Sequence, residues 1–301
     1  MRVALFTDTY DEISGVGHTF RLLAEHCRRR GLPLDIFTVS PEASSVEENG
    51  SVTIHRIKPR IPLNYYPGLY LDLVPLDDTV LAYGREHRFD VIHVATPGHM
   101  GITGMYLAVK LALPLIGSYH TELPRYVSQR LVGHLDQSFE DDDEAREYVA
   151  EVSATLTWDY LTCFYDHCLK VLVPSQFTRT QVAERLSPPL DIFPRGVDTT
   201  LFSPARRGRG EGPPRLLYVG RLAVEKNLEW LVAFGRAHPE YEVVIVGDGP
   251  ERGRLEAALP QAQFRGFLQG EELAREYADA EVFAFPSQTE TFGNVVLEAQ
   301  A

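Results

Sequence analysis

Short, almost wholly apolar runs that alternate with longer helical patterns constrain this chain more than any other feature. Val3–Thr7, Leu115–Ser118 and Val243–Val246 are examples of such runs. A strand that is apolar at nearly every position is buried on both faces of its sheet. Helices between consecutive strands connect them as crossovers, which makes those strands parallel. The pattern therefore predicts an α/β fold built on parallel sheets.

The same pattern occurs twice along the 301 residues, and a chain of this length commonly forms about two domains. Pro204–Pro214 is rich in Arg, Gly and Pro and has no apolar periodicity, which is typical of a linker. We therefore expect a Rossmann-like domain over residues 1–203, a linker over 204–214 and a second Rossmann-like domain over 215–301. The second has only about four expected strands and ends within a helix that starts near Phe292, so we expect it to be truncated.

Charge and cysteine content exclude several classes of protein. Lys and Arg number 29 and Asp and Glu 42, a net charge of −13 that argues against sequence-blind binding to nucleic acid. Cys27, Cys163 and Cys168 fit neither a disulfide framework nor a zinc pattern. We expect Cys163, His167 and Cys168 to pack on a buried helix rather than bind a metal. The sequence has no signal peptide and no long apolar span, so a cytoplasmic location is expected.

Two features of the first half follow expected strands, and open parallel sheets bind ligands beyond the carboxyl ends of their strands. Gly15 and Gly17 partly match a dinucleotide fingerprint, but the third glycine is missing and the loop from Thr7 is long. They form either a flexible turn or a glycine loop that offers a helix N-terminus to an anion or sugar. His120 follows Leu115–Ser118 and either donates to a ligand hydroxyl or is an ordinary packed histidine.

Two cations and two carboxylates stand out in the second half. Arg221 ends an expected strand beside a glycine and Lys226 follows five residues later, a pair that suits a diphosphate. Gly293 precedes an expected helix, where backbone N–H groups can approach a phosphate. Glu290 and Glu298 would lie on one helix face, about 12 Å apart along its axis, and could contact the two parts of a long ligand.

Taken together, these segments resemble the retaining GT-B glycosyltransferases of family 4. The resemblance rests on stretches in family order that span nearly the whole chain: FTDTYDEISGVG, HVATPG, SYHTELPRYV, VLVPSQFTRTQ, PRGVDTTLFSP, YVGRLAVEKNL, VIVGDGPER and FAFPSQTETFGNVVLEAQA. The family fold implies two Rossmann-like domains that face a cleft. The region Tyr119–Tyr126 is most similar to members that use lipid or mannose-type acceptors.

The resemblance also implies a role for each candidate residue on the donor side. Arg221 and Lys226 would hold the diphosphate of a nucleotide sugar. Glu298 would bind the ribose, and Glu290 would contact hydroxyls of the transferred sugar. Backbone donors to phosphate and sugar would come from Phe292, Gly293 and Asn294. The family is usually metal-independent, so no cofactor besides the nucleotide-sugar co-substrate is expected.

From the first domain, Gly15 and Gly17 would form the loop under the diphosphate, and His120 would lie near the anomeric centre. The implied reaction moves a hexose from a UDP- or GDP-linked sugar to a lipid or glycan hydroxyl with retention. The alternatives are a GT-B nucleotide-sugar epimerase and a non-catalytic sugar-nucleotide binding module. A lipid acceptor would bring the protein to the inner membrane face, where Arg56, Lys58 and Arg60 form either a docking patch or a solvated hairpin tip.

Overall fold

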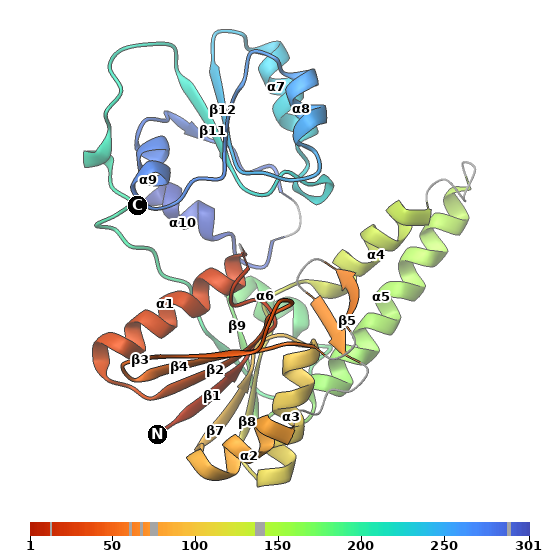
Figure 1. Cartoon of the computed structure of the whole chain (residues 1–301). Coiled ribbons are helices and arrows are strands. Elements are labelled where there is room, and N and C mark those ends of the chain that lie inside the picture. Colours follow the sequence, from red (N-terminus) through yellow and green to blue (C-terminus); the bar gives the residue numbers. More distant parts are fainter. Residues whose placement is uncertain (13, 60–61, 67–68, 73–77, 136–141, 288–289) are drawn as a thin grey trace. The chain divides into compact units, whose positions relative to one another are not determined.

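The computed structural model describes residues 1–12, 14–59, 62–66, 69–72, 78–135, 142–287 and 290–301 (Figure 1). Over these residues the chain packs as two compact units, Met1–Pro194 and Arg195–Ala301. Each unit has its own sheet and its own apolar core. The segment expected to be a linker, Pro204–Pro214, falls within the second unit.

The first unit is built on an eight-stranded sheet in the order β10-β9-β8-β7-β1-β2-β4-β3. Its strands are β1 (Val3–Phe6), β2 (Leu34–Val39), β3 (Ser45–Asn49), β4 (Val52–Ile57), β7 (Val91–Val94), β8 (Leu115–Ser118), β9 (Lys170–Val173) and β10 (Leu190–Ile192). All neighbours are parallel except β3, which pairs antiparallel with β4. A separate hairpin joins β5 (Pro62–Tyr66) and β6 (Leu69–Asp72).

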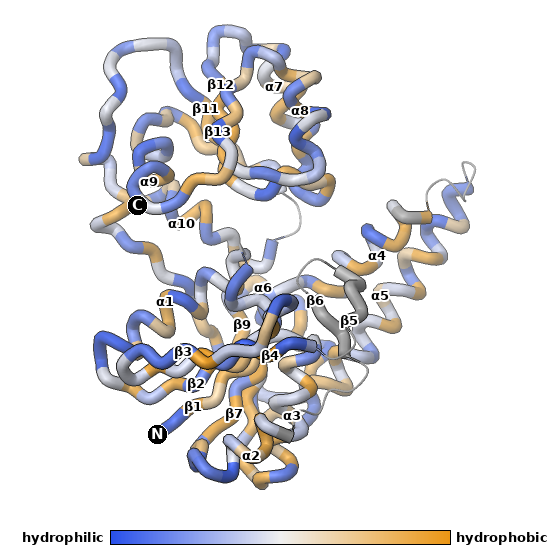
Figure 2. Tube along the Cα trace, in the orientation of Figure 1, coloured by the Kyte–Doolittle hydropathy of each residue, from blue (hydrophilic) through white to orange (hydrophobic). Residues whose placement is uncertain are grey.

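Helices cover both faces of this sheet, which explains why its central strands are almost wholly apolar. The helices are α1 (Gly15–Arg30), α2 (Asp78–His87), α3 (His99–Leu111), α4 (Leu123–Leu135), α5 (Asp143–Tyr165) and α6 (Gln176–Val182). Leu5 packs in one cluster with Phe20 of α1, while the next residue of β1, Phe6, packs in another cluster with Met100 of α3. The apolar colour along the central strands in Figure 2 follows this two-sided burial.

The second unit repeats the design around a four-stranded parallel sheet in the order β13-β12-β11-β14. Its elements are β11 (Arg215–Val219), α7 (Glu229–Ala237), β12 (Glu242–Val246), α8 (Arg252–Ala258), β13 (Gln263–Gly266), α9 (Gly270–Ala278), β14 (Val282–Phe283) and α10 (Asn294–Gln300). Leu216 faces the cluster that contains Leu231 of α7 and Leu255 of α8, whereas Leu217 faces the cluster that contains Val295 of α10. The predicted α/β class is therefore confirmed in both units.

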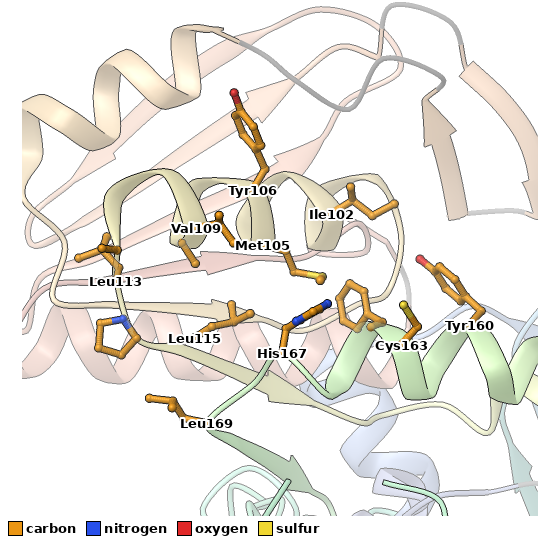
Figure 3. Close-up of a pocket in the computed structure, with 14 residues that line it drawn as sticks. Ile102, Met105, Tyr106, Val109, Leu113, Leu115, Tyr160, Cys163, His167 and Leu169 are labelled. Atoms are coloured by element: carbon orange, nitrogen blue, oxygen red, sulfur yellow. The ribbon is translucent and has the colours of Figure 1, made fainter. Parts of the chain in front are cut away.

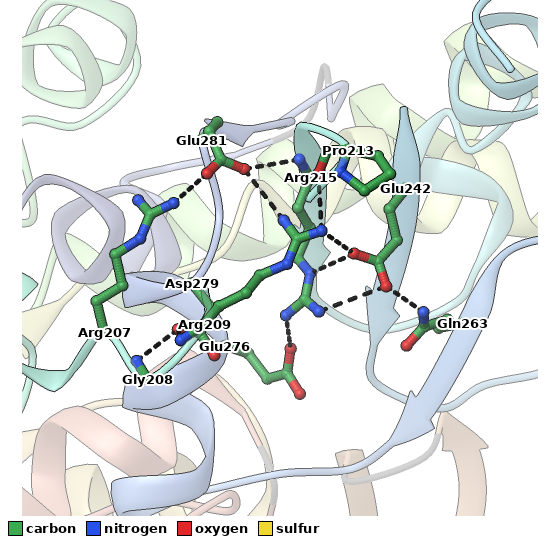
Figure 4. A network of polar contacts seen from close by, with 10 residues as sticks. All are labelled: Arg207, Gly208, Arg209, Pro213, Arg215, Glu242, Gln263, Glu276, Asp279 and Glu281. Atoms are coloured by element: carbon green, nitrogen blue, oxygen red, sulfur yellow. Dashed lines mark hydrogen bonds and ion pairs between the residues drawn. The ribbon is translucent and has the colours of Figure 1, made fainter. Parts of the chain in front are cut away.

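The segment expected to be a linker is tied firmly to the second unit (Figure 4). Arg209 forms ion pairs with Glu242 at 2.8 Å and Glu281 at 3.5 Å, and Arg207 also pairs with Glu281. The Asp279 carboxylate accepts hydrogen bonds from the backbone N–H groups of Gly208 and Arg209 at 2.8 and 2.9 Å. The expected linker is therefore held by ion pairs and hydrogen bonds rather than by apolar side chains, which explains why its sequence has no apolar periodicity.

Two expectations about single segments need correction. Gly15 and Gly17, expected in a turn or in a loop before a helix, are already part of α1, because the Ser14 side chain accepts from the backbone N–H of Gly17 and caps the first turn. Cys163 lies on α5 but is exposed, His167 follows the end of α5 at Tyr165 and is also exposed, and only Cys168 of the expected buried group is buried. Within the described ranges, no group of three metal-ligating side chains is found.

No helix among the described residues is both long and apolar enough to span a bilayer. Of the residues considered for either a docking patch or a solvated hairpin tip, Arg56 pairs with Asp11 at 2.7 Å and with Glu47 at 2.9 Å, so its charge is compensated within the protein. Lys58 is exposed, while Arg60 lies outside the described residues.

Candidate functional site

An ion pair joins two of the predicted site residues at the carboxyl edge of the second sheet. The Nζ atom of Lys226 contacts Oε1 of Glu290, and the two side chains are 21% and 27% exposed. The Ser287 hydroxyl donates to the same carboxylate at 3.3 Å. Lys226 follows β11 and Glu290 follows β14, and these strands are parallel neighbours. The parallel pairing therefore brings together two residues that are 64 positions apart in the sequence.

The loop that carries Arg221 is held by close backbone packing. The Tyr218 hydroxyl donates to the carbonyl oxygen of Arg221 at 3.0 Å. A Cβ atom at Gly247 would lie 1.9 Å from the Gly220 oxygen, and one at Gly249 would lie 2.3 Å from the Leu222 oxygen. Only glycine allows the loop after β12 to approach the loop after β11 this closely. The Arg221 side chain itself is exposed at this edge.

Glu298 lies on α10, and its Oε2 atom accepts a hydrogen bond from the Tyr277 hydroxyl at 2.9 Å. Burial raises the pKa of Glu298, and the hydrogen bond from Tyr277 opposes that shift. Gly293 has φ of 82° and stands immediately before the helix, where its left-handed backbone turns the chain. Phe292 precedes this glycine, and Asn294 is the first helical residue.

The expectation that Glu290 and Glu298 share one helix face is wrong. The helix begins at Asn294 rather than near Phe292, so Glu290 stands in the loop that follows β14. This position is what allows Glu290 to contact Lys226. The two carboxylates are held by different partners, one by a cation and the other by a phenol.

In the first unit, the remaining predicted residues meet at the carboxyl edge of the larger sheet. Gly15 and Gly17 lie in the first turn of α1 rather than in a loop before it. A Cβ atom at Gly17 would approach the Thr9 and Glu12 oxygens to 2.4 and 2.8 Å, so the preceding loop folds directly against this glycine. The Phe20 ring of α1 packs edge-on against His120, with 5.3 Å between centroids. The glycine turn and His120 are thus linked through Phe20.

His120 is 7% exposed and comes two residues after the end of β8. Behind it, the Nε2 atom of His93 and the Ser118 hydroxyl form a hydrogen bond of 2.6 Å, and the Tyr165 hydroxyl donates to the Ser118 carbonyl oxygen at 2.8 Å. Burial lowers the pKa of His93 to about 4, which keeps this ring neutral. The hydroxyl and the carbonyl oxygen of Ser118 are therefore both hydrogen-bonded, which fixes the chain two residues before His120.

Asp8, which the sequence pattern did not single out, lies at the same edge and is only 3% exposed. Its carboxylate accepts from the Thr96 hydroxyl and from the backbone N–H of Met100, the latter at 3.0 Å. Burial raises the pKa of Asp8 to about 7 despite these bonds. The sequence could have indicated Asp8 through its position, since it comes two residues after the end of β1, where parallel sheets bind ligands.

An apolar groove of about 680 Å³ lies elsewhere on the first unit, between α3 and the C-terminal part of α5 (Figure 3). Tyr160, Cys163 and His167 lie along its α5 side, and Met105 and Val109 along its α3 side. None of the predicted site residues lines this groove. The predicted site residues lie instead at the carboxyl edge of the sheet in their own unit.

Comparison with solved structures identifies the architecture as that of a GT-B glycosyltransferase. Sucrose-phosphate synthase from Thermosynechococcus elongatus superposes with a TM-score of 0.71 at 22% identity, covering 99% of this chain and 78% of that one. Anabaena Alr3699/HepE in complex with UDP and glucose superposes with a TM-score of 0.66 at 16% identity, with the same coverage. At these identities the likeness shows the fold.

The sequence comparisons then define the family. The model for Glycosyltransferase Family 4 matches residues 13–201, and that for glycosyl transferases group 1 matches residues 213–301. A GDP-mannose-dependent alpha-mannosyltransferase from Corynebacterium glutamicum is 30% identical over 100% of this chain and 70% of its own length. Alpha-monoglucosyldiacylglycerol synthase from Streptococcus pneumoniae is 25% identical over 100% and 69%. The chain belongs to glycosyltransferase family 4 and is a glycosyltransferase.

Proposed function

We propose that this enzyme transfers a hexose from a nucleoside-diphosphate sugar to an acceptor hydroxyl with retention of anomeric configuration. A GDP-linked mannose is the first donor to test, because that donor is in the name of the relative that is 30% identical. A lipid hydroxyl is the first acceptor class to test, because another relative is named for a diacylglycerol product. A glycan hydroxyl is the alternative acceptor.

The observation that carries the proposal is the ion pair between Lys226 and Glu290. It joins the loop proposed to bind the diphosphate to the loop proposed to bind the sugar. Arg221 lies in the same β11 loop as Lys226, and Glu298 lies on the helix that follows Glu290. Cations and carboxylates thus gather at one edge of one sheet, where parallel sheets commonly bind nucleotides.

The chemistry of the reaction explains why these side chains suit the site. Cleavage of the bond between sugar and diphosphate places negative charge on the departing oxygen. We propose that Arg221 and Lys226 stabilise that charge in place of a metal cation, with further donors from the backbone N–H groups of Phe292, Gly293 and Asn294. Groups fixed in position before the reaction stabilise a transition state most effectively. Glu290 would orient the sugar hydroxyls, and Glu298 would hold the ribose.

From the first unit, we propose that His120 approaches the transferred sugar near its anomeric centre. Its burial and the packing of Phe20 against it suit a side chain that must hold one orientation. Gly15 and Gly17 would bring the first turn of α1 close to the diphosphate. The Gly17 N–H already donates to Ser14, so the contribution of this turn is close backbone approach rather than a free donor at Gly17.

The test combines a donor panel with transfer assays. A donor that binds only the folded protein raises its melting temperature, so GDP-mannose, UDP-glucose and UDP-galactose are first compared by thermal shift. Transfer of labelled sugar to diacylglycerol and to glycan acceptors follows, and NMR of the anomeric proton reports retention. Donor consumption that yields only an isomeric nucleotide sugar would instead indicate an epimerase, and binding without turnover a binding module.

Two variants link the activity to the site. Lys226→Ala and Glu298→Ala should each lower the rate of transfer, with about a 100- to 1,000-fold loss for Lys226 if it stabilises the leaving group. Lys110→Ala is the matched control, since Lys110 is an exposed lysine on α3 outside the candidate site. Unchanged turnover in both site variants would refute the proposed roles.

A further inference from the structure

A single phenol on α9 determines the orientation of the Glu298 carboxylate. The Tyr277 hydroxyl donates to Glu298 Oε2 at 2.9 Å, and this is the one side-chain hydrogen bond of that carboxylate within the described residues. The Tyr277 ring packs edge-on against Phe202, with 5.6 Å between centroids, and is tilted against Phe283 at the same distance. With aromatic rings against it, the phenol has little freedom to turn its hydroxyl elsewhere.

The helix that carries Tyr277 is itself anchored by residues 202–209. Phe202 is buried against the ring, and Arg206 pairs with Glu271 in the first turn of α9 at 3.0 Å. At the other end, Asp279 follows the helix and accepts the backbone N–H groups of Gly208 and Arg209 (Figure 4). The segment that precedes the second sheet therefore holds α9 at both ends, and α9 in turn holds Glu298.

We propose that Tyr277 is a positioning residue for the nucleoside part of the donor, because it presents the Glu298 carboxylate to the vicinal hydroxyls of a ribose. The inference rests on the proposed function, since it assumes that Glu298 meets the donor. With Oε2 held by the phenol, Oε1 remains to accept from a ligand hydroxyl. A glutamate that is fixed in advance loses less rotamer freedom on binding, and affinity increases accordingly.

The Tyr277 hydroxyl also increases nucleotide affinity through the ionisation state of Glu298. Burial raises the pKa of Glu298, and the phenol hydrogen bond opposes that rise. Tyr277 therefore favours the ionised carboxylate, whose hydrogen bonds to hydroxyls are stronger than those of the neutral acid. Removal of the phenolic oxygen should weaken nucleotide binding more strongly at pH 6 than at pH 8.

The experiment is calorimetry of GDP and UDP with the wild-type chain, Tyr277→Phe and Tyr241→Phe. Tyr241 is a half-buried tyrosine of the same unit that packs against Phe234 away from Glu298, and it controls for loss of a phenolic oxygen. We expect Tyr277→Phe to weaken binding of the ribonucleotide about 3- to 10-fold. Binding of the matching 2′,3′-dideoxynucleotide should be equal in wild type and variant, because the hydroxyls that Glu298 would accept are missing.

Combination with Glu298→Gln separates positioning from a general structural effect. In a double-mutant cycle, Tyr277→Phe should add little further loss once Glu298 is changed. Equal losses for ribo- and dideoxynucleotides, additive losses in the cycle, or no loss at all would each overturn the role of Tyr277. Failure of the wild-type chain to bind either GDP or UDP would instead refute the proposed function, so the two failures are distinguishable.

Discussion

Replacement of Asp8 by asparagine tests whether a buried carboxyl at the edge of the first sheet is protonated near neutral pH. Burial raises the pKa of Asp8 from 3.8 to about 7 in the folded protein. The folded state therefore binds this proton more tightly than the unfolded state does. The resulting stabilisation is fully present below about pH 4 and is lost as the pH rises through 7. At 1.36 kcal/mol per pKa unit the whole effect is about 4 kcal/mol, of which about 2 kcal/mol falls between pH 5.5 and 8.

The assay uses the two tryptophans of the chain, Trp158 in the first unit and Trp230 in the second. In a Trp230→Phe background, fluorescence during urea unfolding reports the first unit alone. The free energy of unfolding is measured from pH 5.5 to 8 for the protein with Asp8 and for the Asp8→Asn variant. The difference between the two curves isolates this one side chain, because all other titrating groups are common to both proteins.

We expect the difference in unfolding free energy between the Asp8 protein and the Asp8→Asn variant to fall by about 2 kcal/mol as the pH rises over that range. Glu42→Gln, which removes an exposed carboxylate from the same unit, controls for the change in net charge. A flat difference curve for Asp8→Asn would refute the inference that burial outweighs the hydrogen bonds from Thr96 and Met100.

Three further perturbations probe other parts of the molecule. Burial lowers the pKa of His93 to about 4, so the neutral ring contributes about 3 kcal/mol of unfolding free energy that is present above pH 6.5 and lost as the pH falls through 4. His93→Asn should remove this pH dependence, whose sign is opposite to that of Asp8. Acid unfolding followed by Trp158 fluorescence measures the change. Gly17→Ala should cost about 1–3 kcal/mol of unfolding free energy in urea, since its Cβ would strike fixed backbone oxygens, whereas Gly133→Ala, with open space around its Cβ, should not destabilise. Asp279→Ala should cost about 1–2 kcal/mol in the second unit, measured through Trp230, because two partly buried N–H groups lose their acceptor.

Much of the fold could be predicted because the information is local. The apolar runs Val3–Thr7, Leu115–Ser118 and Val243–Val246 correspond to β1, β8 and β12, since a short run that is apolar at nearly every position suits a strand between two helical layers. The polar strand Ser45–Asn49 was missed because all five of its residues are exposed and no alternation marks it. The start of α1 was missed because glycines disfavour helix interiors, while the signal that fixes it, the Ser14 cap, is one residue.

Individual residues of the candidate site could be predicted from the sequence, but not all of the contacts between their side chains. Arg221, Lys226 and Glu290 stand at strand ends that the apolar pattern locates, and the parallel pairing of β11 with β14 brings their loops together. The contact of Tyr277 with Glu298 had no such signal, because it depends on how α9 and α10 pack on the same face of the sheet. Side-chain partners across helices follow from packing geometry, which composition and spacing do not carry.

If Lys226 binds the donor as proposed, its ion pair with Glu290 would give both side chains a partner before the donor arrives. A partly exposed ion pair of this kind is worth only about 0–1 kcal/mol, so breaking it costs little. In the proposed function, a donor diphosphate would bring more negative charge than one carboxylate and could accept from Arg221 as well as from Lys226, so we expect it to displace Glu290 from the lysine. Glu290, once released, would lie where the sugar follows the diphosphate, and its charge would be compensated by sugar hydroxyls. Donor binding in this scheme exchanges one anion for another at Lys226 and needs no unpaired buried charge at any stage.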